Sequence, residues 1–252
     1  MGRQSQLVFR MGRMKVGDVT PTVLTAAIVV MAIAIAAREL REWRGDRASP
    51  PPMPVFDGRW RDALEHAFQR TNPAASVTLL EFVDMECPAC RESHSAIRAL
   101  AKKYGHRLSV AFVHYPLKTH AYARLGAFAV VCAGRQGRVD HAMDRIFEDQ
   151  RLLSAFEASD FARSITIPRV DAFEACVADS TRIAEAQQGR SAGERMQLTG
   201  TPTIVINGWR FRGAVSQHYL AQAIDDLSAG RKPRFAEASG TRPFAPNDDA
   251  LK

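Results

Sequence analysis

Two cysteines separated by two residues follow a largely apolar run, and this arrangement limits the possible folds of the chain more than any other feature. The run 79–86 leads into Cys87, Pro88, Ala89 and Cys90, and a segment with helical spacing follows. The dipole and the free amides at a helix start favour the thiolate of the first cysteine, and proline is well tolerated at the first helical position. Cys87 is therefore the candidate nucleophile. Cys90, one turn later, is the candidate resolving thiol that attacks a mixed disulfide at Cys87.

The segments around this motif predict a βαβ unit. Residues 77–83 and 108–114 have the composition of strands, and residues 88 to about 103 have helical periodicity. Far downstream, residues 200–203 precede the apolar strand 204–206. A Cys-x-x-Cys pair without such neighbours would also fit half of a zinc site or chance. With them, the pattern indicates a redox domain.

Taken together, these segments resemble the DsbA-like thiol:disulfide oxidoreductases. The resemblance covers about residues 77–227 and rests on segments 81–84, 87–90, 114–117, 132–137, 200–203 and 207–208. It implies an α/β, thioredoxin-like fold with an inserted helical subdomain at about 118–198, preceded by one N-terminal hydrophobic helix. It also implies that the enzyme needs no cofactor beyond its redox-active disulfide.

The resemblance assigns roles to five further positions. Pro202 is expected to be a cis-proline that faces the cysteines, with the backbone of Thr201 available to pair with a client segment. Pro88 and Ala89 are expected to contact the client; in the most oxidising relatives a histidine occupies the position of Ala89. Glu81 is expected to lie beneath the disulfide and to accept the proton of the resolving thiol. The alternative for Glu81 is a strand residue that faces solvent.

Two further cysteines and a histidine lie in segments with helical spacing. Cys132 and Cys176 fall within the insertion, where similar family members carry a second disulfide. Closing that long loop would stabilise the fold by an amount on the order of 4 kcal/mol. The alternative is two buried free thiols. His94 is expected to pack within its helix, or else to tune the cysteine pair or join a metal site.

The charge of the chain does not indicate nucleic-acid binding. The net charge is +7, but the Lys and Arg residues are scattered and no basic run is interleaved with aromatic residues. Asp84 and Glu86 are interpreted as surface acids. The positive charge is interpreted as a solvated basic surface together with an arginine-rich, membrane-proximal region.

The chain divides into five segments by composition. Residues 1–18 form a basic leader, and residues 19–37 form an apolar stretch that predicts a membrane anchor or a cleaved signal peptide. Residues 38–57 form a linker, 58–228 the folded domain, and 229–252 a flexible tail. Helical spacing over 58–70 predicts that the folded domain begins with a helix there. A dithiol oxidant is useful where disulfides persist, so we expect a single-pass protein of the bacterial inner membrane with its catalytic domain in the periplasm. Signal cleavage would leave it soluble in the periplasm.

The leading hypothesis is an extracytoplasmic oxidoreductase that passes the Cys87–Cys90 disulfide to reduced or misoxidised client polypeptides. A quinone-linked or other membrane redox partner would recharge it. A second hypothesis is a reductase or isomerase that a membrane donor keeps reduced. A third is an envelope copper- or zinc-binding module that uses Cys87, Cys90 and His94, and a fourth is a non-catalytic holdase.

Overall fold

The computed structural model describes residues 26–37, 53–179 and 183–234. The chain divides into two compact units, Met1–Ala48 and Ser49–Lys252. The whole predicted leader, and most of the predicted linker and tail, lie outside the described residues.

The predicted localisation as a single-pass protein of the bacterial inner membrane is wrong. Residues 26–37 form a helix, and residues 19–25 of the predicted apolar stretch lie outside the described residues. In the described ranges, no helix combines the length and the apolar character that a membrane span requires. This finding overturns the predicted localisation in the bacterial inner membrane.

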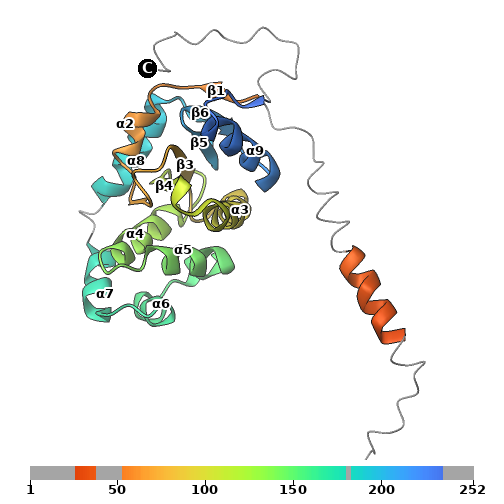
Figure 1. Ribbon diagram of the computed structural model, residues 1–252. Coiled ribbons are helices and arrows are strands. Elements are labelled where there is room, and N and C mark those ends of the chain that lie inside the picture. The colour runs from red at the N-terminus through yellow and green to blue at the C-terminus, as the bar shows by residue number, and fades with distance from the viewer. Residues whose placement is uncertain (1–25, 38–52, 180–182, 235–252) are drawn as a thin grey trace, which may run out of the picture. The chain divides into compact units, whose positions relative to one another are not determined.

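The second unit is built on one sheet, which has six strands in its described part (Figure 1). The strand order is β1-β6-β5-β3-β4-β2. In chain order the strands are β1 (Val55–Phe56), β2 (Gln69–Arg70), β3 (Val77–Val83), β4 (Leu108–His114), β5 (Thr203–Ile206) and β6 (Trp209–Arg212).

The central strand, β3, pairs parallel with β4 and antiparallel with β5. Every residue of β3 and β4 is buried, which is why both strands read as nearly continuous apolar runs. Leu79 and Val83 contribute to one core, whereas Leu80 and Phe82 contribute to a second. The side chains of β3 thus alternate between two cores, and its carboxyl end leads directly to the Cys-x-x-Cys motif.

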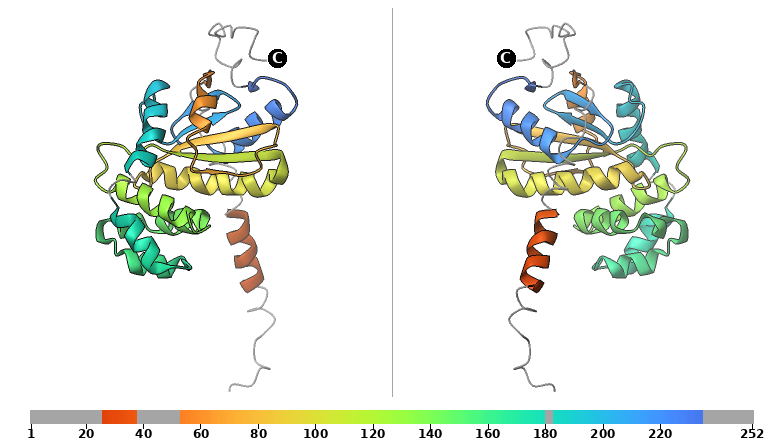
Figure 2. Two further views of the ribbon diagram at one scale, coloured as in Figure 1. Left: turned by 90° about the vertical axis from the view of Figure 1, so that its left-hand side faces the viewer. Right: turned by 90° about the vertical axis from the view of Figure 1, so that its right-hand side faces the viewer.

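Helices cover the sheet and form the insertion between β4 and β5 (Figures 1 and 2). Side chains of α3, α9 and α4–α7 build the first core, and those of α2 and α8 build the second. Along the chain these elements are α2 (Trp60–Leu64), α3 (Pro88–Tyr104), the 3-10 helix η1 (Gly105–Arg107), α4 (Ala123–Gly134), α5 (Val139–Glu148), the 3-10 helix η2 (Gln150–Ala155), α6 (Ala158–Ser164), α7 (Val170–Ala178), α8 (Ile183–Arg195) and α9 (Gln217–Ser228).

The predicted α/β, thioredoxin-like fold with a helical insertion is confirmed. The turn between β5 and β6 has positive φ at both Asn207 (46°) and Gly208 (91°), as a type I′ turn requires. One local expectation is wrong, because the helix that the spacing of 58–70 indicates stops at Leu64. Phe68 instead donates its N–H to the carbonyl of Phe112 (3.0 Å) and leads into the edge strand β2.

Candidate active site

Cys87 is the N-cap residue of α3, and Pro88 occupies the first helical position. The turn that precedes the helix is closed by the Cys87 N–H, which donates to the Asp84 carbonyl (3.2 Å). Cys87 is 6% exposed and Cys90 is fully buried, and both are free thiols. The structure therefore holds a reduced pair. Of the two cysteines, only Cys87 reaches solvent, through a small exposed area.

The two thiols differ strongly in acidity. The pKa of Cys87 is lowered to about 5, chiefly by the hydrogen bond from Cys90. Burial opposes this change, while the Thr201 side chain and the backbone N–H groups of Cys90 and Ala89 add to it. Burial raises the pKa of Cys90 far above its ordinary value, and its hydrogen bond to Cys87 and the charges of Glu81 and Cys87 raise it further. Cys87 is thus the thiolate at neutral pH, and Cys90 keeps its proton.

The loop before β5 completes the site opposite Cys87. The Thr201-Pro202 peptide bond is cis, and as a thiol Cys87 donates to the Thr201 carbonyl (3.4 Å). The Thr201 hydroxyl is buried without a hydrogen-bond partner. As a thiolate, Cys87 can accept from that hydroxyl, since the Thr201 side chain lowers its pKa.

Glu81 lies on β3, and its side chain is fully buried. Neither carboxyl oxygen has a hydrogen-bond partner. Burial raises the pKa of Glu81 to about 8; the Ser93 hydroxyl on α3 opposes the rise and the charge of Cys87 adds to it. The structure therefore places Glu81 in the interior rather than facing solvent. An acid with this pKa can hold or release a proton near neutral pH.

Asp84 is a residue of the site that sequence reasoning missed. Its side chain is buried, not at the surface, and its carboxylate accepts three hydrogen bonds of 2.8 Å, from Glu86 N, Leu117 N and His120 Nδ1. Its own N–H donates to the Cys90 sulfur (3.5 Å). Asp84 therefore ties the loop after β4 to the turn that carries the cysteines.

Gln150, from the insertion, also supports this turn. Its Nε2 donates to the carbonyls of Met85 and Cys87, at 2.9 Å in both cases. Nothing in the local sequence marks Gln150, because its partners lie more than sixty positions earlier. The inserted helices thus contribute directly to the geometry at Cys87.

The structure joins Cys132 on α4 to Cys176 on α7 by a disulfide with a Cα–Cα distance of 5.8 Å. His94 is buried between aromatic rings, and its Nε2 pairs with Asp144 of α5 (2.6 Å). Across residues 26–37, 53–179 and 183–234, no group of three or more His, Cys, Asp or Glu side chains is arranged to hold a metal ion. His94 therefore links α3 to the insertion.

Comparison with known sequences identifies a family. A family model described as Thioredoxin matches residues 68–226. A curated relative, the Na(+)/H(+) antiporter NhaA 3 of Salinispora tropica, is 30% identical over 172 residues, which is 67% of this chain and 26% of the antiporter. The chain spans about a quarter of the length of the curated relative that it matches.

Solved structures share the fold. A thioredoxin-like oxidoreductase from Silicibacter pomeroyi superposes with a TM-score of 0.56 at 21% identity, covering 66% of this chain and 95% of its own. The thiol-disulfide exchange protein alpha-DsbA2 from Wolbachia pipientis superposes with a TM-score of 0.55 at 18% identity, covering 67% of this chain and 92% of its own. At this identity the likeness establishes the architecture, and the chemistry has to be argued from the residues themselves.

Proposed function

Because this chain belongs to the thioredoxin family, we propose that it is a thiol:disulfide oxidoreductase that donates the Cys87–Cys90 disulfide to client polypeptides. The observation that carries the proposal is the contrast in acidity between the two thiols, a pKa of about 5 for Cys87 against a strongly raised pKa for Cys90. The resemblance to DsbA-like proteins and the cis-Pro202 loop beside Cys87 support the same chemistry.

Exchange takes two steps. A client thiolate attacks the Cys87 sulfur of the oxidised protein, the Cys87–Cys90 bond breaks, and the sulfur of Cys90 leaves and takes up a proton. A second client thiolate then attacks the client sulfur of the mixed disulfide, and Cys87 leaves as a thiolate. The client loses two electrons and gains a disulfide, while the protein gains the two electrons as a reduced pair.

The low pKa of Cys87 favours donation over reduction. A stabilised thiolate makes the reduced protein more stable, and it is also the better leaving group in the second step. Catalytic turnover then requires reoxidation, so the proposal includes an electron-accepting partner; a quinone-linked membrane partner is the kind that the resemblance implies.

Five residues support the two cysteines in this proposal. The charge of Glu81 is one of the causes of the raised pKa of Cys90, so the two groups interact. Glu81 therefore takes the proton that Cys90 gives up when the pair is reoxidised. Thr201, with Pro202 behind it, pairs through its backbone with an extended client segment beside Cys87. Pro88 is exposed and Ala89 half-buried at the mouth of the site, where both can contact the client.

The decisive measurement is the reduction potential of the Cys87–Cys90 couple in the full chain, equilibrated against glutathione. We expect a value above about −200 mV, between those of thioredoxin, at about −270 mV, and the strongest oxidants of this fold, at about −120 mV. A value at or below that of thioredoxin would overturn donation and assign the reverse electron flow.

A trapping experiment tests the mixed disulfide. The Cys90→Ser variant is first activated at Cys87 as a mixed disulfide with 5-thio-2-nitrobenzoate and is then mixed with an unfolded client that carries a single thiol. The client thiolate should attack the Cys87 sulfur, 5-thio-2-nitrobenzoate leaves, and the covalent complex should accumulate because the resolving thiol is absent. The matched Cys87→Ser variant should form none. Equal trapping by both variants would show that Cys87 is not the attacked sulfur.

A further inference from the structure

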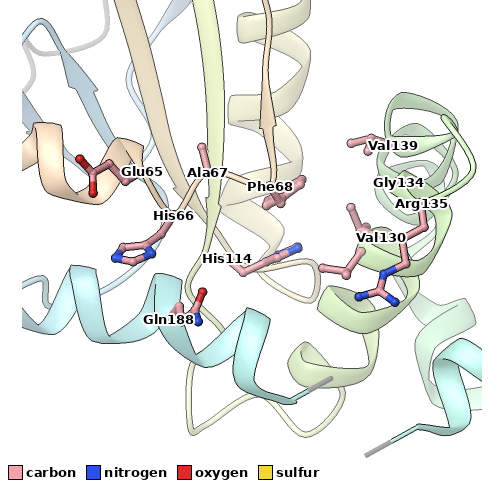
Figure 3. A pocket seen from close by; sticks show the side chains of 11 residues that line it. Glu65, His66, Ala67, Phe68, His114, Val130, Gly134, Arg135, Val139 and Gln188 are labelled. Carbon is pink, nitrogen blue, oxygen red and sulfur yellow. The ribbon is translucent and has the colours of Figure 1, made fainter. Parts of the chain in front are cut away.

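A cavity of about 350 Å³ lies apart from the cysteine pair. It opens between the segment that precedes β2, the carboxyl end of β4 and helices α4 and α8 (Figure 3). None of the residues assigned to the active site lines it. Its volume falls at the lower end of the range of small-molecule sites.

His114, the last residue of β4, is the unusual group in its wall. The residue is 3% exposed, and neither ring nitrogen has a hydrogen-bond partner. The Phe68 ring stacks on the imidazole at a centroid distance of 3.8 Å and an interplanar angle of 10°. Figure 3 shows the imidazole extending from β4 toward Val130 on α4. Buried polar atoms without partners are rare in folded proteins, and each carries a desolvation cost.

The unpartnered imidazole defines what its complement must offer. Burial lowers the pKa of His114 to about 3, so the ring is neutral at pH 7. A neutral imidazole has one N–H donor and one nitrogen acceptor. The two nitrogens point away from each other, so one compact polar group pairs with only one of them. Because that nitrogen is a donor in one tautomer and an acceptor in the other, a group that can both donate and accept fits either form.

The rest of the wall limits the charge and polarity of the occupant. Val130, Val131 and Val139 give the cavity an apolar side. Glu65 and Arg135 are the lining residues with formal charge, and their charges cancel. An apolar wall, a neutral hydrogen-bonding group and no net charge favour a neutral, amphipathic molecule over an ion.

We propose that this cavity is a binding site for a small neutral molecule with an apolar body and a head that both donates and accepts hydrogen bonds, such as a primary carboxamide or an alcohol. The head binds the His114 imidazole, and the body lies against the valines of α4 and α5.

The test uses the full chain labelled with ¹⁵N in its histidine rings. The His114 signals are assigned as those lost in His114→Phe, and the protein is titrated with benzamide, benzyl alcohol, toluene and benzoate. We expect benzamide and benzyl alcohol to shift the His114 nitrogens saturably, and toluene, which has the same ring without the polar head, to bind at least tenfold more weakly. If neither benzamide nor benzyl alcohol shifts these signals, ordered water alone fills the cavity and the proposal fails. Tighter binding of benzoate than of benzamide would overturn the neutral class.

A second variant keeps His114 in place. Val131→Phe adds a ring to the cavity wall, and we expect it to weaken benzamide binding at least tenfold while the His114 signals persist. His106→Gln, at an exposed histidine of η1, is the matched control and should leave the titration unchanged. Unaltered binding by Val131→Phe would place benzamide elsewhere on the protein and overturn the assignment.

Discussion

At the scale of single residues, the acidity of Cys87 comes from its immediate surroundings rather than from a histidine within the motif. Ala89 contributes its backbone N–H, and the thiol of Cys90 and the side chain of Thr201 contribute more. These donors are fixed by the start of α3 and by the loop before β5. A thioredoxin-fold protein can therefore lower the pKa of its nucleophile with an alanine at the position before the second cysteine.

Asp84 gives a prediction at this scale. Asp84→Asn replaces an acceptor-only carboxylate with a group that carries two donors of its own, so it cannot serve all three N–H groups that now reach it. We expect the free energy of unfolding to fall by about 1–3 kcal/mol and the pKa of Cys87 to change, because the site turn and the loop after β4 separate. Urea unfolding and the pH dependence of Cys87 alkylation measure the two effects.

His120→Ala is the milder companion variant. It removes one of the three donors to Asp84 and leaves the two backbone donors in place, so its effects should be smaller than those of Asp84→Asn. If Asp84→Asn leaves both stability and alkylation unchanged, the loop is held by other contacts.

The residues that carry out the chemistry can be predicted from their types, whereas the residues that hold them in place cannot. Cys87, Cys90 and Pro202 stand out because few other residues can perform their roles. In the sequence, Asp84 resembles a surface acid, because the local sequence does not reveal its partners. Leu117 and His120 lie 33 and 36 positions away. Only the folded chain brings such groups together.

At the scale of elements, the packing of α8 on β4 depends on a glycine. A Cβ at Gly189 would lie 2.5 Å from the carbonyl oxygen of His114, which is backbone and cannot turn aside. Gly189→Ala should lower the free energy of unfolding by about 1–3 kcal/mol through overpacking, as measured by urea unfolding. Gly58→Ala, where a Cβ meets nothing within 4 Å, is the control and should be nearly neutral. Equal effects of both substitutions would argue against the close contact.

The disulfide between α4 and α7 gives a second prediction at this scale. It links cysteines 44 positions apart, and a closed loop of that length stabilises the fold by about 4 kcal/mol in the chain-entropy description. The double variant Cys132→Ala/Cys176→Ala should lose stability of that order in urea unfolding while keeping exchange activity at Cys87. Loss of activity at a temperature where the variant is still folded would instead show that this bond shapes the site.

A helix or strand can be predicted from the sequence when its own residues determine it, and not when it depends on a partner far along the chain. β3 and β4 are visible in the sequence because both of their faces are buried and their side chains are apolar throughout. β1 and β2 have two residues each and exist only because β6 and β4 offer backbone partners. The helical spacing of Trp60 and Leu64 continues to Phe68. The helix nevertheless ends at Leu64, because the backbone from Phe68 onward pairs with β4 instead.

At the scale of the whole molecule, the pH dependence of stability should differ between the two redox forms. Glu81 has a folded pKa of about 8 against an ordinary value of 4.5. Between these values the folded state holds a proton that the unfolded state has lost, so the free energy of unfolding falls as pH rises. Cys87 acts in the opposite direction, because its pKa falls from 9.0 to about 5 on folding. In the disulfide form Cys87 does not titrate, and the Glu81 contribution remains.

The oxidised protein should therefore lose roughly 1–2 kcal/mol of stability from pH 6.5 to 8, while the reduced protein changes less. His114, with its pKa lowered from 6.5 to about 3, opposes this loss only slightly and only at the lower end of the window, where the unfolded imidazole is still partly protonated. Urea unfolding of both forms at the two pH values provides the measurement. In the oxidised state, Glu81→Gln should remove the slope; a slope that persists in that variant would assign it to another group.

The order of the strands in the sheet has a consequence for biosynthesis. β3 leaves the ribosome early, but its neighbour β5 and the Thr201 carbonyl that faces Cys87 are encoded more than a hundred residues later. Both Cys132 and Cys176 emerge within that interval. The nascent chain thus presents all four of its thiols before its own catalytic centre is enclosed, and the first polypeptide within reach of Cys87 is the one to which it belongs.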